Sequence, residues 1–262
     1  MSMESQTPRT SHLGDAVRDA VLEIGTEEIP ARFMPDALEQ IEREGGRLLS
    51  EERVAHGTVR AFGTPRRLVL YVEGVAPIGP PMVRETKGPA YNVAFDAAGN
   101  PTRAAEGFAR SRGVRVQDLI VKEEPKGRFV YAVSREPGRP AKEALASAFL
   151  RLVTTLSFPK SMRWSDREFR FARPIRWILA LFGDEVVPFE VDGIRAGRLS
   201  SGHRFLTTGV LEVAKAEDYI EVLRRAYCMV DHRERRHVIS KGAREAAEAV
   251  GGRVVEDPGL LE

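Results

Sequence analysis

The sequence predicts an α+β fold with mixed and antiparallel sheets, packed helices and two modules. Paired apolar runs with strand character flank turn residues, as in "TVRAF" and "RRLVLYVEGV" around Gly63-Thr64-Pro65. Other segments repeat their apolar residues at helical spacing. The elements follow in mixed order, with hairpins and without regular strand–helix–strand alternation. This order favours an α+β architecture over a parallel α/β one.

The first module is expected over residues 21–157, after a flexible tail at 1–20. Its helices are recognised by apolar residues spaced three and four apart, although Gly45 and Gly46 weaken the first one. Gly113 is a plausible C-terminal cap for the second. The expected elements are a strand at 20–25, a helix at 34–48, strands at 58–62 and 66–75, an exposed Pro- and Gly-rich connection at 75–89, a helix at 102–112, a hairpin at 116–136 around Pro125-Lys126-Gly127, and a helix from about 140 to 156.

The second module is expected over residues 158–262, truncated at its C-terminal end. Gly183-Asp184 is a good two-residue hairpin turn between two apolar strands. The expected elements are strands at 175–182 and 185–191, a loop at 193–206, a helix at 217–226, a short strand at 228–230, a helix at 232–250 with one apolar face, and a strand start at 253–255.

The bulk composition limits the class of protein. The chain has 262 residues, 42% of them hydrophobic and 30% charged, as in a globular protein with a substantial core. Its formal charge is only +2, so attraction to nucleic acid has to come from local clusters. One cysteine, Cys228, excludes an internal disulfide and fits a cytoplasmic location. No apolar run reaches the roughly 18 residues that span a bilayer, and the polar start differs from a signal peptide.

Motifs for catalysis are not found. There is no P-loop, no G-x-G-x-x-G after a strand and no G-x-S-x-G elbow. His232 and His237 lie five residues apart on a predicted helix, which turns their rings away from each other. We therefore expect no catalytic residue, no metal site and no bound cofactor in this chain.

One basic stretch, residues 158–177 ("FPKSMRWSDREFRFARPIRW"), is the strongest candidate site. Phe169 and Phe171 alternate with arginines, which suits an extended segment with its rings facing the core and its cations facing water. Guanidinium groups bind phosphate in planar, bidentate geometry, and Trp164 could offer a stacking face. We favour contact with a polyanion over a plain solvated edge. The cations are Lys160, Arg163, Arg167, Arg170, Arg173 and Arg176.

Two smaller cationic pairs are weaker candidates. Arg66 and Arg67 begin a strand, so one should point inward, toward a carboxylate, and the other outward, toward a phosphate. His203 and Arg204 lie in a loop that Phe205-Leu206 is expected to anchor. For each pair a structural ion pair or solvated loop is about as plausible as contact with a ligand.

The adjacent carboxylates Glu27 and Glu28 in "GTEEIP" are poor partners for acid–base catalysis, because neighbours in a chain point in different directions. They are better interpreted as first-turn acids near a helix dipole, or as a turn that faces a partner.

Several long blocks resemble the N-terminal part of the bacterial glycyl-tRNA synthetase beta subunit. They are "LEIGTEEIPARF", "AFGTPRRLVLYV", "KGPAYNVAFDAAGNPTRAAEGFARSRGV", the basic stretch continued to "GDEVVPFEVDGI", and "GHRFL". The resemblance runs in order from about Val21 to the last residue and implies that this chain holds less than half of such a subunit.

The resemblance implies a role in an α2β2 enzyme that joins glycine to tRNA-Gly with ATP. In that family the alpha subunit carries the class II active site, so ATP and Mg are expected there. The beta subunit recognises tRNA through parts that include domains beyond this chain. We therefore expect this chain alone to be inactive, with tRNA and the alpha subunit as partners and no DNA or membrane partner.

Two roles for the basic stretch stay open. It could grip phosphates of the tRNA acceptor arm, with Trp164 or His203 and Arg204 near the 3′ end. Alternatively, "FPKSMRW" and "GTEEIP" could form the contact with the alpha subunit, since Arg and Trp are also favoured at protein interfaces. In that case the chain would be a scaffold without direct RNA contact. The interface candidates in "GTEEIP" are Glu27, Glu28, Ile29 and Pro30.

Overall fold

The structure is a computed structural model that describes residues 17–164 and 168–261. The described chain divides into two compact units. The larger unit comprises the residues up to Ile78 and from Pro140 onward, and the inserted unit is Gly79–Arg139. The predicted boundary between residues 157 and 158 therefore lies inside the larger unit. Its two sides cannot be separate modules, because strands from both sides pair in one sheet.

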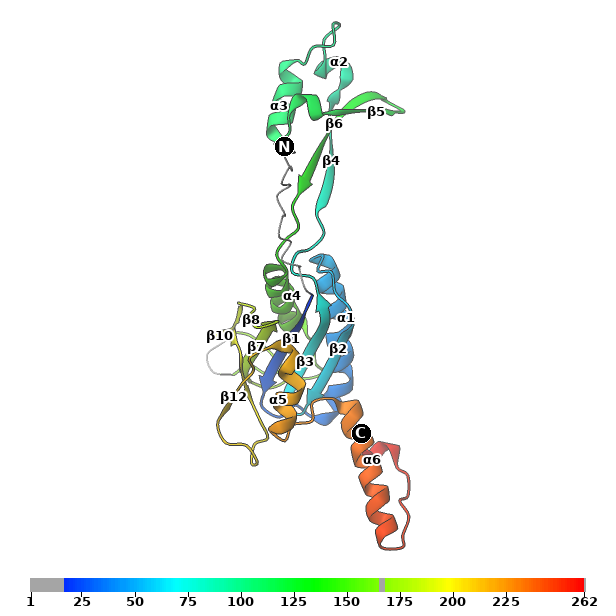
Figure 1. The fold of residues 1–262 in the computed structure, drawn as a ribbon, viewed down its shortest axis with the longest axis vertical. Helices are drawn as coiled ribbons and strands as arrows, with labels where there is room; N and C mark the ends of the chain where they lie inside the picture. Colours follow the sequence, from blue (N-terminus) through cyan, green and yellow to red (C-terminus); the bar gives the residue numbers. More distant parts are fainter. Residues whose placement is uncertain (1–16, 165–167, 262) are drawn as a thin grey trace, which may run out of the picture. The chain divides into compact units, whose positions relative to one another are not determined.

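A seven-stranded mixed sheet forms the centre of the larger unit (Figure 1), which confirms the predicted fold class. Every pairing is antiparallel except that of β10 with β7. The order is β2 (Val59–Thr64), β3 (Arg67–Val75), β1 (Arg18–Thr26), β7 (Ile175–Phe182), β10 (Ile194–Gly197) and β9 (Glu190–Val191), with β8 (Glu185–Val186) paired to β7. Of the predicted tail at 1–20, the described part from Arg18 onward belongs to β1, and the rest lies outside the described residues.

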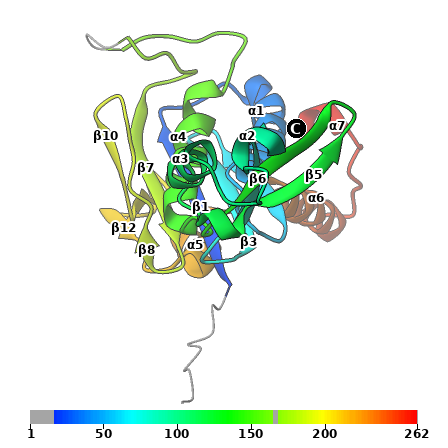
Figure 2. The same cartoon turned by 90° about the horizontal axis from the view of Figure 1, so that it is seen from above.

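Side chains alternate between two cores on opposite faces of this sheet. Leu22 and Ile24 of β1 pack with α1 (Met34–Glu51) and α4 (Ala141–Thr155), whereas Val21 packs with α5 (Tyr219–Arg225) on the other face. Figure 2 shows α5 and α1 on opposite sides of β1 and β3. Strand alternation with both faces covered explains why these strands are continuous apolar runs.

The glycine in the middle of α1 has a packing role. A Cβ atom on Gly45 would lie 2.7 Å from Leu70 Cδ1 of β3. Gly45 therefore allows the helix to approach the sheet closely, which compensates for the low helix propensity of glycine.

The remaining elements of the larger unit correct several predictions. The predicted loop at 193–206 contains β10 and β11 (Leu199–Ser201), and β11 pairs with β12 (Val210–Glu212). Residues 228–230 and 253–255 are not strands. The predicted strand at 185–191 is two short ones, because β8 pairs with β7 while β9 pairs with β10. The unit also contains α6 (His232–Ala249), α7 (Pro258–Leu261), η1 (Ala31–Phe33) and η3 (Ala216–Asp218).

The inserted unit is a three-stranded antiparallel sheet with small helices. Its core centres on Ala94, Ala105 and Val130. The connection predicted at 75–89 is wrong from Met82 onward, because these residues form β4 and pair with β6 over most of their length, although they are exposed or half-buried as predicted. The elements are β4 (Met82–Ala90), β6 (Gly127–Glu136), β5 (Ile120–Glu124), α2 (Tyr91–Ala94), α3 (Arg103–Ser111) and η2 (Val116–Asp118), in the sheet order β4-β6-β5.

Candidate nucleic-acid interface

Aromatic rings support the described part of the basic stretch from below. Phe171 is fully buried, and its ring lies 4.8 Å from that of Phe158 and 6.1 Å from that of Phe169. Trp164 meets Phe169 edge to face at 6.0 Å. The partly buried rings of this group pack on the core shared with α1 and α4. The predicted arrangement, with rings toward the core, is confirmed for these residues.

The cations of the described part face outward. Arg163 is paired with exposed Glu168 at 3.1 Å, and Arg170 donates to the carbonyl oxygen of Ser161 at 3.1 Å. Both interactions are at the surface, where ion pairs contribute little. Arg167 lies outside the described residues. The exposed cations are Lys160, Arg163, Arg170, Arg173 and Arg176.

The "GTEEIP" turn lies against this stretch. The Nε of Arg173 donates to the carbonyl oxygen of Glu28 at 2.9 Å, and the Nε of Arg176 lies 3.4 Å from Glu27 Oε1. Of the interface candidates, Glu28 is exposed and Glu27 and Pro30 are half-buried. Ile29 is 2% exposed and packs in the core, so its side chain is unavailable to a partner.

The loop with His203 and Arg204 meets the same turn. Arg204 NH1 lies 3.7 Å from Glu28 Oε1. Glu28 therefore stands between Arg204 and Arg173, which are far apart in the sequence. The expectation that Phe205 and Leu206 anchor this loop is wrong, because they are 84% and 60% exposed.

Of the other cationic pair, Arg66 and Arg67, the second does not join this surface. The Arg67 side chain is 3% exposed, and NH1 lies 3.8 Å from Oε2 of Glu23, itself fully buried. It is the inward member that the strand pattern required, with the expected carboxylate partner, and cannot reach a phosphate. Arg66 is half-buried, and its buried Nε has no hydrogen-bond partner among the described residues.

Glu23 organises a buried polar cluster that the sequence interpretation missed. Its Oε1 accepts hydrogen bonds from Trp177 Nε1 and Ser200 Oγ, and its Oε2 accepts one from the Tyr219 hydroxyl. Burial, together with the Glu23 carboxylate, raises the pKa of Tyr219 well above its usual value. Burial is the largest single influence on the pKa of Arg67 and lowers it, but the negative groups facing the guanidinium, of which Glu23 is the strongest, together outweigh burial, and the net shift is upward. The cluster therefore holds the side chains of one buried acid and one buried guanidinium, 3.8 Å apart.

One signal in the sequence and one feature of the structure point to this cluster. Glu23 interrupts the apolar run "AVLEIG", where a charge facing a buried helix layer needs a partner. Gly25 pairs across the sheet with Trp177, and a Cβ atom there would lie 1.9 Å from Trp177 Cε2. The cluster thus fixes Trp177, the last residue of the basic stretch, directly after the exposed Arg176.

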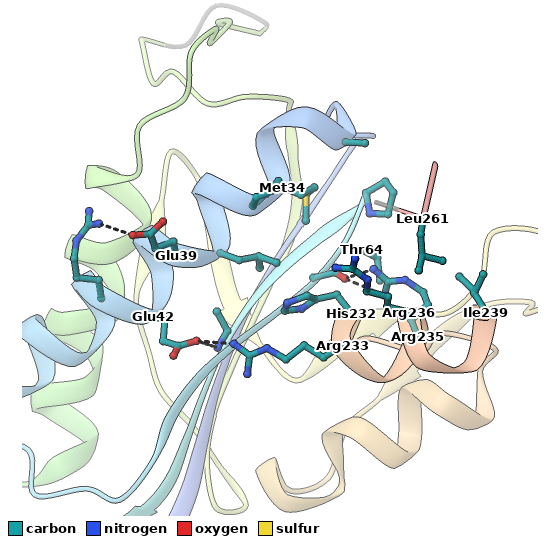
Figure 3. Close-up of a pocket in the computed structure, with 17 residues that line it drawn as sticks. Met34, Glu39, Glu42, Thr64, His232, Arg233, Arg235, Arg236, Ile239 and Leu261 are labelled. Carbon is teal, nitrogen blue, oxygen red and sulfur yellow. Dashed lines mark hydrogen bonds and ion pairs between the residues drawn. The ribbon is translucent and has the colours of Figure 1, made fainter. Parts of the chain in front are cut away.

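A separate cavity of about 820 Å³ lies between α1, the end of β2 and α6 (Figure 3). Met34 and Ile239 give it apolar walls, and Arg233 at its edge lies 3.9 Å from Glu42. The Nδ1 atom of His232 is buried there without a hydrogen-bond partner among the described residues. Burial and the neighbouring arginines lower the pKa of His232 below its usual value. None of the predicted site residues lines this cavity.

Across residues 17–164 and 168–261, no group of three His, Cys, Asp or Glu side chains is arranged to hold a metal ion. Within the same residues, no helix has the length and apolar character needed to cross a membrane.

The inserted unit contains the excess positive charge of the chain. Residues 79–139 carry eleven Lys and Arg against seven Asp and Glu, and the other residues carry 29 and 31. The cations of the inserted unit are scattered along its sequence, so they form no basic run that would reveal its positive net charge.

Comparison with known proteins identifies the family. Residues 20–262 match the family model described as "Glycyl-tRNA synthetase beta subunit". The chain belongs to this family. It is 51% identical over 243 residues to the glycine–tRNA ligase beta subunit of Desulforudis audaxviator, and 50% identical over 245 residues to that of Moorella thermoacetica. These matches cover 93% and 94% of the chain but 35% of each relative, so the chain spans about a third of the length of these beta subunits.

One block of the family resemblance contributes to both the buried Glu23 cluster and the turn beside the basic stretch. The "LEIGTEEIP" segment supplies Glu23 and Gly25 to the buried cluster, and Glu27 and Glu28 to the turn beside the basic stretch. Blocks that are separate in the sequence are therefore adjacent in the fold.

Proposed function

We propose that this chain is the N-terminal part of a glycine–tRNA ligase beta subunit, and that its basic stretch binds phosphates of the tRNA acceptor arm. The arrangement of exposed arginines over a layer of packed rings carries the proposal. Phosphate binding needs donors at fixed positions, and rings that pack on the core restrict where the backbone of this stretch can move.

The local charge balance favours an anion. The described basic stretch, the "GTEEIP" turn and Arg204 together present six cations against three carboxylates, those of Glu27, Glu28 and Glu168. Arg163, Arg176 and Arg204 are each paired with one carboxylate at a largely exposed site. Such pairs are weak in water, so phosphate oxygens can replace the carboxylates at small cost.

Under this proposal, adenylate chemistry, ATP and Mg belong to the alpha subunit, and the working enzyme is a cytoplasmic α2β2 assembly. This chain would contribute RNA contacts and no catalytic group.

Docking of the alpha subunit is the second candidate role. The exposed Glu28 and the half-buried Trp164 and Pro30 lie on or beside the same surface, and Trp and Arg are common at protein interfaces. In that case the chain would be retained by the alpha subunit without binding tRNA.

Charge reversal separates the two roles. The double substitution Arg170→Glu with Arg173→Glu should weaken binding of a tRNA-Gly transcript at least tenfold at low salt, because phosphates would then face carboxylates. The slope of log K against log salt should also become shallower by about 2. Fluorescence anisotropy over a salt series measures both quantities.

The matched control is Arg195→Glu with Lys241→Glu, which makes the same charge change at side chains that are 87% and 66% exposed elsewhere in the larger unit. It should leave the salt slope within error of the original chain. If the original chain binds no tRNA at low salt but co-purifies with the alpha subunit, the scaffold role is correct. Equal weakening by both double variants would mean that only overall charge matters.

A further inference from the structure

We propose that Phe205 is a stacking platform for an unpaired RNA base, with Arg204 and Arg173 meeting the phosphates beside it. This inference rests on the proposed function, since it specifies which part of an RNA this end of the surface would contact.

The Phe205 side chain is highly exposed to solvent. At 84% exposure, it is the most exposed Phe, Tyr or Trp side chain in the described part of the chain. Its closest aromatic neighbour is His203, at 6.2 Å between ring centroids. Burying such a ring removes apolar surface from water and is favourable, so a partner that covers it would gain affinity.

The loop that carries this ring is held by hydrogen bonds. The carbonyl oxygen of Ala226 accepts from His203 N and from Thr207 Oγ1, both at 2.9 Å. Within the loop, His203 Nδ1 accepts from the backbone N–H of Phe205 at 3.2 Å and of Leu206 at 3.3 Å. Thr207 N donates to the carbonyl oxygen of His203 at 3.0 Å. The ring is therefore presented from an ordered turn, which lowers the entropy cost of binding.

Charge beside the ring favours a nucleotide as the occupant. The Arg204 guanidinium lies 5.9 Å from the Phe205 ring centroid and 3.7 Å from Glu28 Oε1. The Nε of Arg173 holds the carbonyl oxygen of the same Glu28. The Phe205 ring is next to Arg204, and Glu28 contacts both Arg204 and Arg173. The ring therefore lies at the edge of the cationic surface. A single RNA strand needs this combination of a stacking face and adjacent cations.

A double-stranded RNA would not use this ring, because its bases are stacked inside the helix. The unpaired nucleotides at the 3′ end of tRNA are therefore the expected occupant. Stacking on an aromatic side chain is tolerant of base identity, so this contact should contribute affinity without sequence preference.

The test compares two tRNA-Gly transcripts, one complete and one trimmed of its unpaired 3′ nucleotides. Phe205→Ala should weaken binding of the complete transcript between about 5-fold and 100-fold and leave the trimmed one unchanged. Phe205→Trp should retain the original affinity, since any aromatic ring at this position can stack on a base. A 2-aminopurine base at the 3′ end should be quenched by the original chain and by the Trp variant, but not by the Ala variant.

Leu206→Ala is the matched control, because Leu206 is 60% exposed in the same loop and offers no ring. It should bind both transcripts normally. An Ala variant at Phe205 that binds the complete transcript normally, or that loses both transcripts equally, overturns the stacking role. The stacking role is also overturned if Phe205→Ala abolishes binding of the alpha subunit while RNA binding stays intact.

The two proposals fail in different ways. If the trimmed transcript still depends on Arg170 and Arg173 while Phe205→Ala has no effect, only the stacking role is wrong. If the original chain binds neither transcript, both proposals are wrong.

Discussion

Replacing Glu23 with glutamine is expected to lower the free energy of unfolding by about 3–5 kcal/mol, the usual cost of removing one partner of a buried ion pair. Glutamine keeps nearly the same shape and can still accept from Trp177 Nε1. It cannot balance the charge of Arg67, whose side chain is 3% exposed. Urea denaturation measures the change, and the slope m should be unaltered, since the folded state remains equally compact.

A second substitution isolates the charge effect. The pair Glu23→Gln with Arg67→Met should be more stable than Glu23→Gln alone, because it removes the unpaired cation. Glu190→Gln is the surface control: Glu190 pairs with Arg195 at 2.9 Å, and its loss should cost at most about 1 kcal/mol. If Glu23→Gln costs no more than this control, the cluster does not depend on a charged Glu23.

Replacing Gly25 with alanine should destabilise the protein by about 3 kcal/mol, near the upper end of the usual cost of overpacking a core. The added Cβ atom would lie 1.9 Å from Trp177 Cε2, so the indole ring must move and lose its hydrogen bond to Glu23. Thermal and urea unfolding measure the loss. Because Trp177 follows Arg176 directly, the variant should also weaken tRNA binding while it is still folded.

Two controls test this explanation. Gly46→Ala, in α1, has no atom within 4 Å of the new Cβ and should stabilise the protein by about 0.5–1 kcal/mol. In a chain that already carries Trp177→Leu, Gly25→Ala should lower the free energy of unfolding by less than it does in the original chain, since the smaller side chain leaves room for the new Cβ atom. A Gly25→Ala variant as stable as the original chain would show that the indole moves without cost.

The elements with strong internal patterns were predictable. The apolar period of α1 and α4 and the strand runs of β1, β3 and β7 depend on short-range residue order, and the structure confirms each of them. Predictions failed where pairing depends on distant segments. β4 follows a Pro- and Gly-rich segment and has Gly88-Pro89 near its end, and only its ladder with β6 makes it a strand.

The candidate site was predictable in part for the same reason. Alternation of Phe169 and Phe171 with Arg170 is a local pattern, and it gave the correct exposure of Arg170. The burial of Ile29 and Arg67 and the exposure of Phe205 depend on which layer covers each residue. No neighbouring residue in the sequence carries that information.

By itself, the sequence determined the α+β class and a cationic segment with its rings on one side, because periodicity and composition are properties of the chain. It also determined the family, because long blocks match those of the beta subunits in order. Only the tertiary structure decided that "GTEEIP", the basic stretch and the His203–Leu206 loop share one surface. It also decided that Glu23 and Arg67 form an interior pair. The physical reason is that strands β1 and β7, whose bonded residues Glu23 and Trp177 are 154 positions apart, become neighbours only when the sheet forms. Charges then interact according to their distance in space.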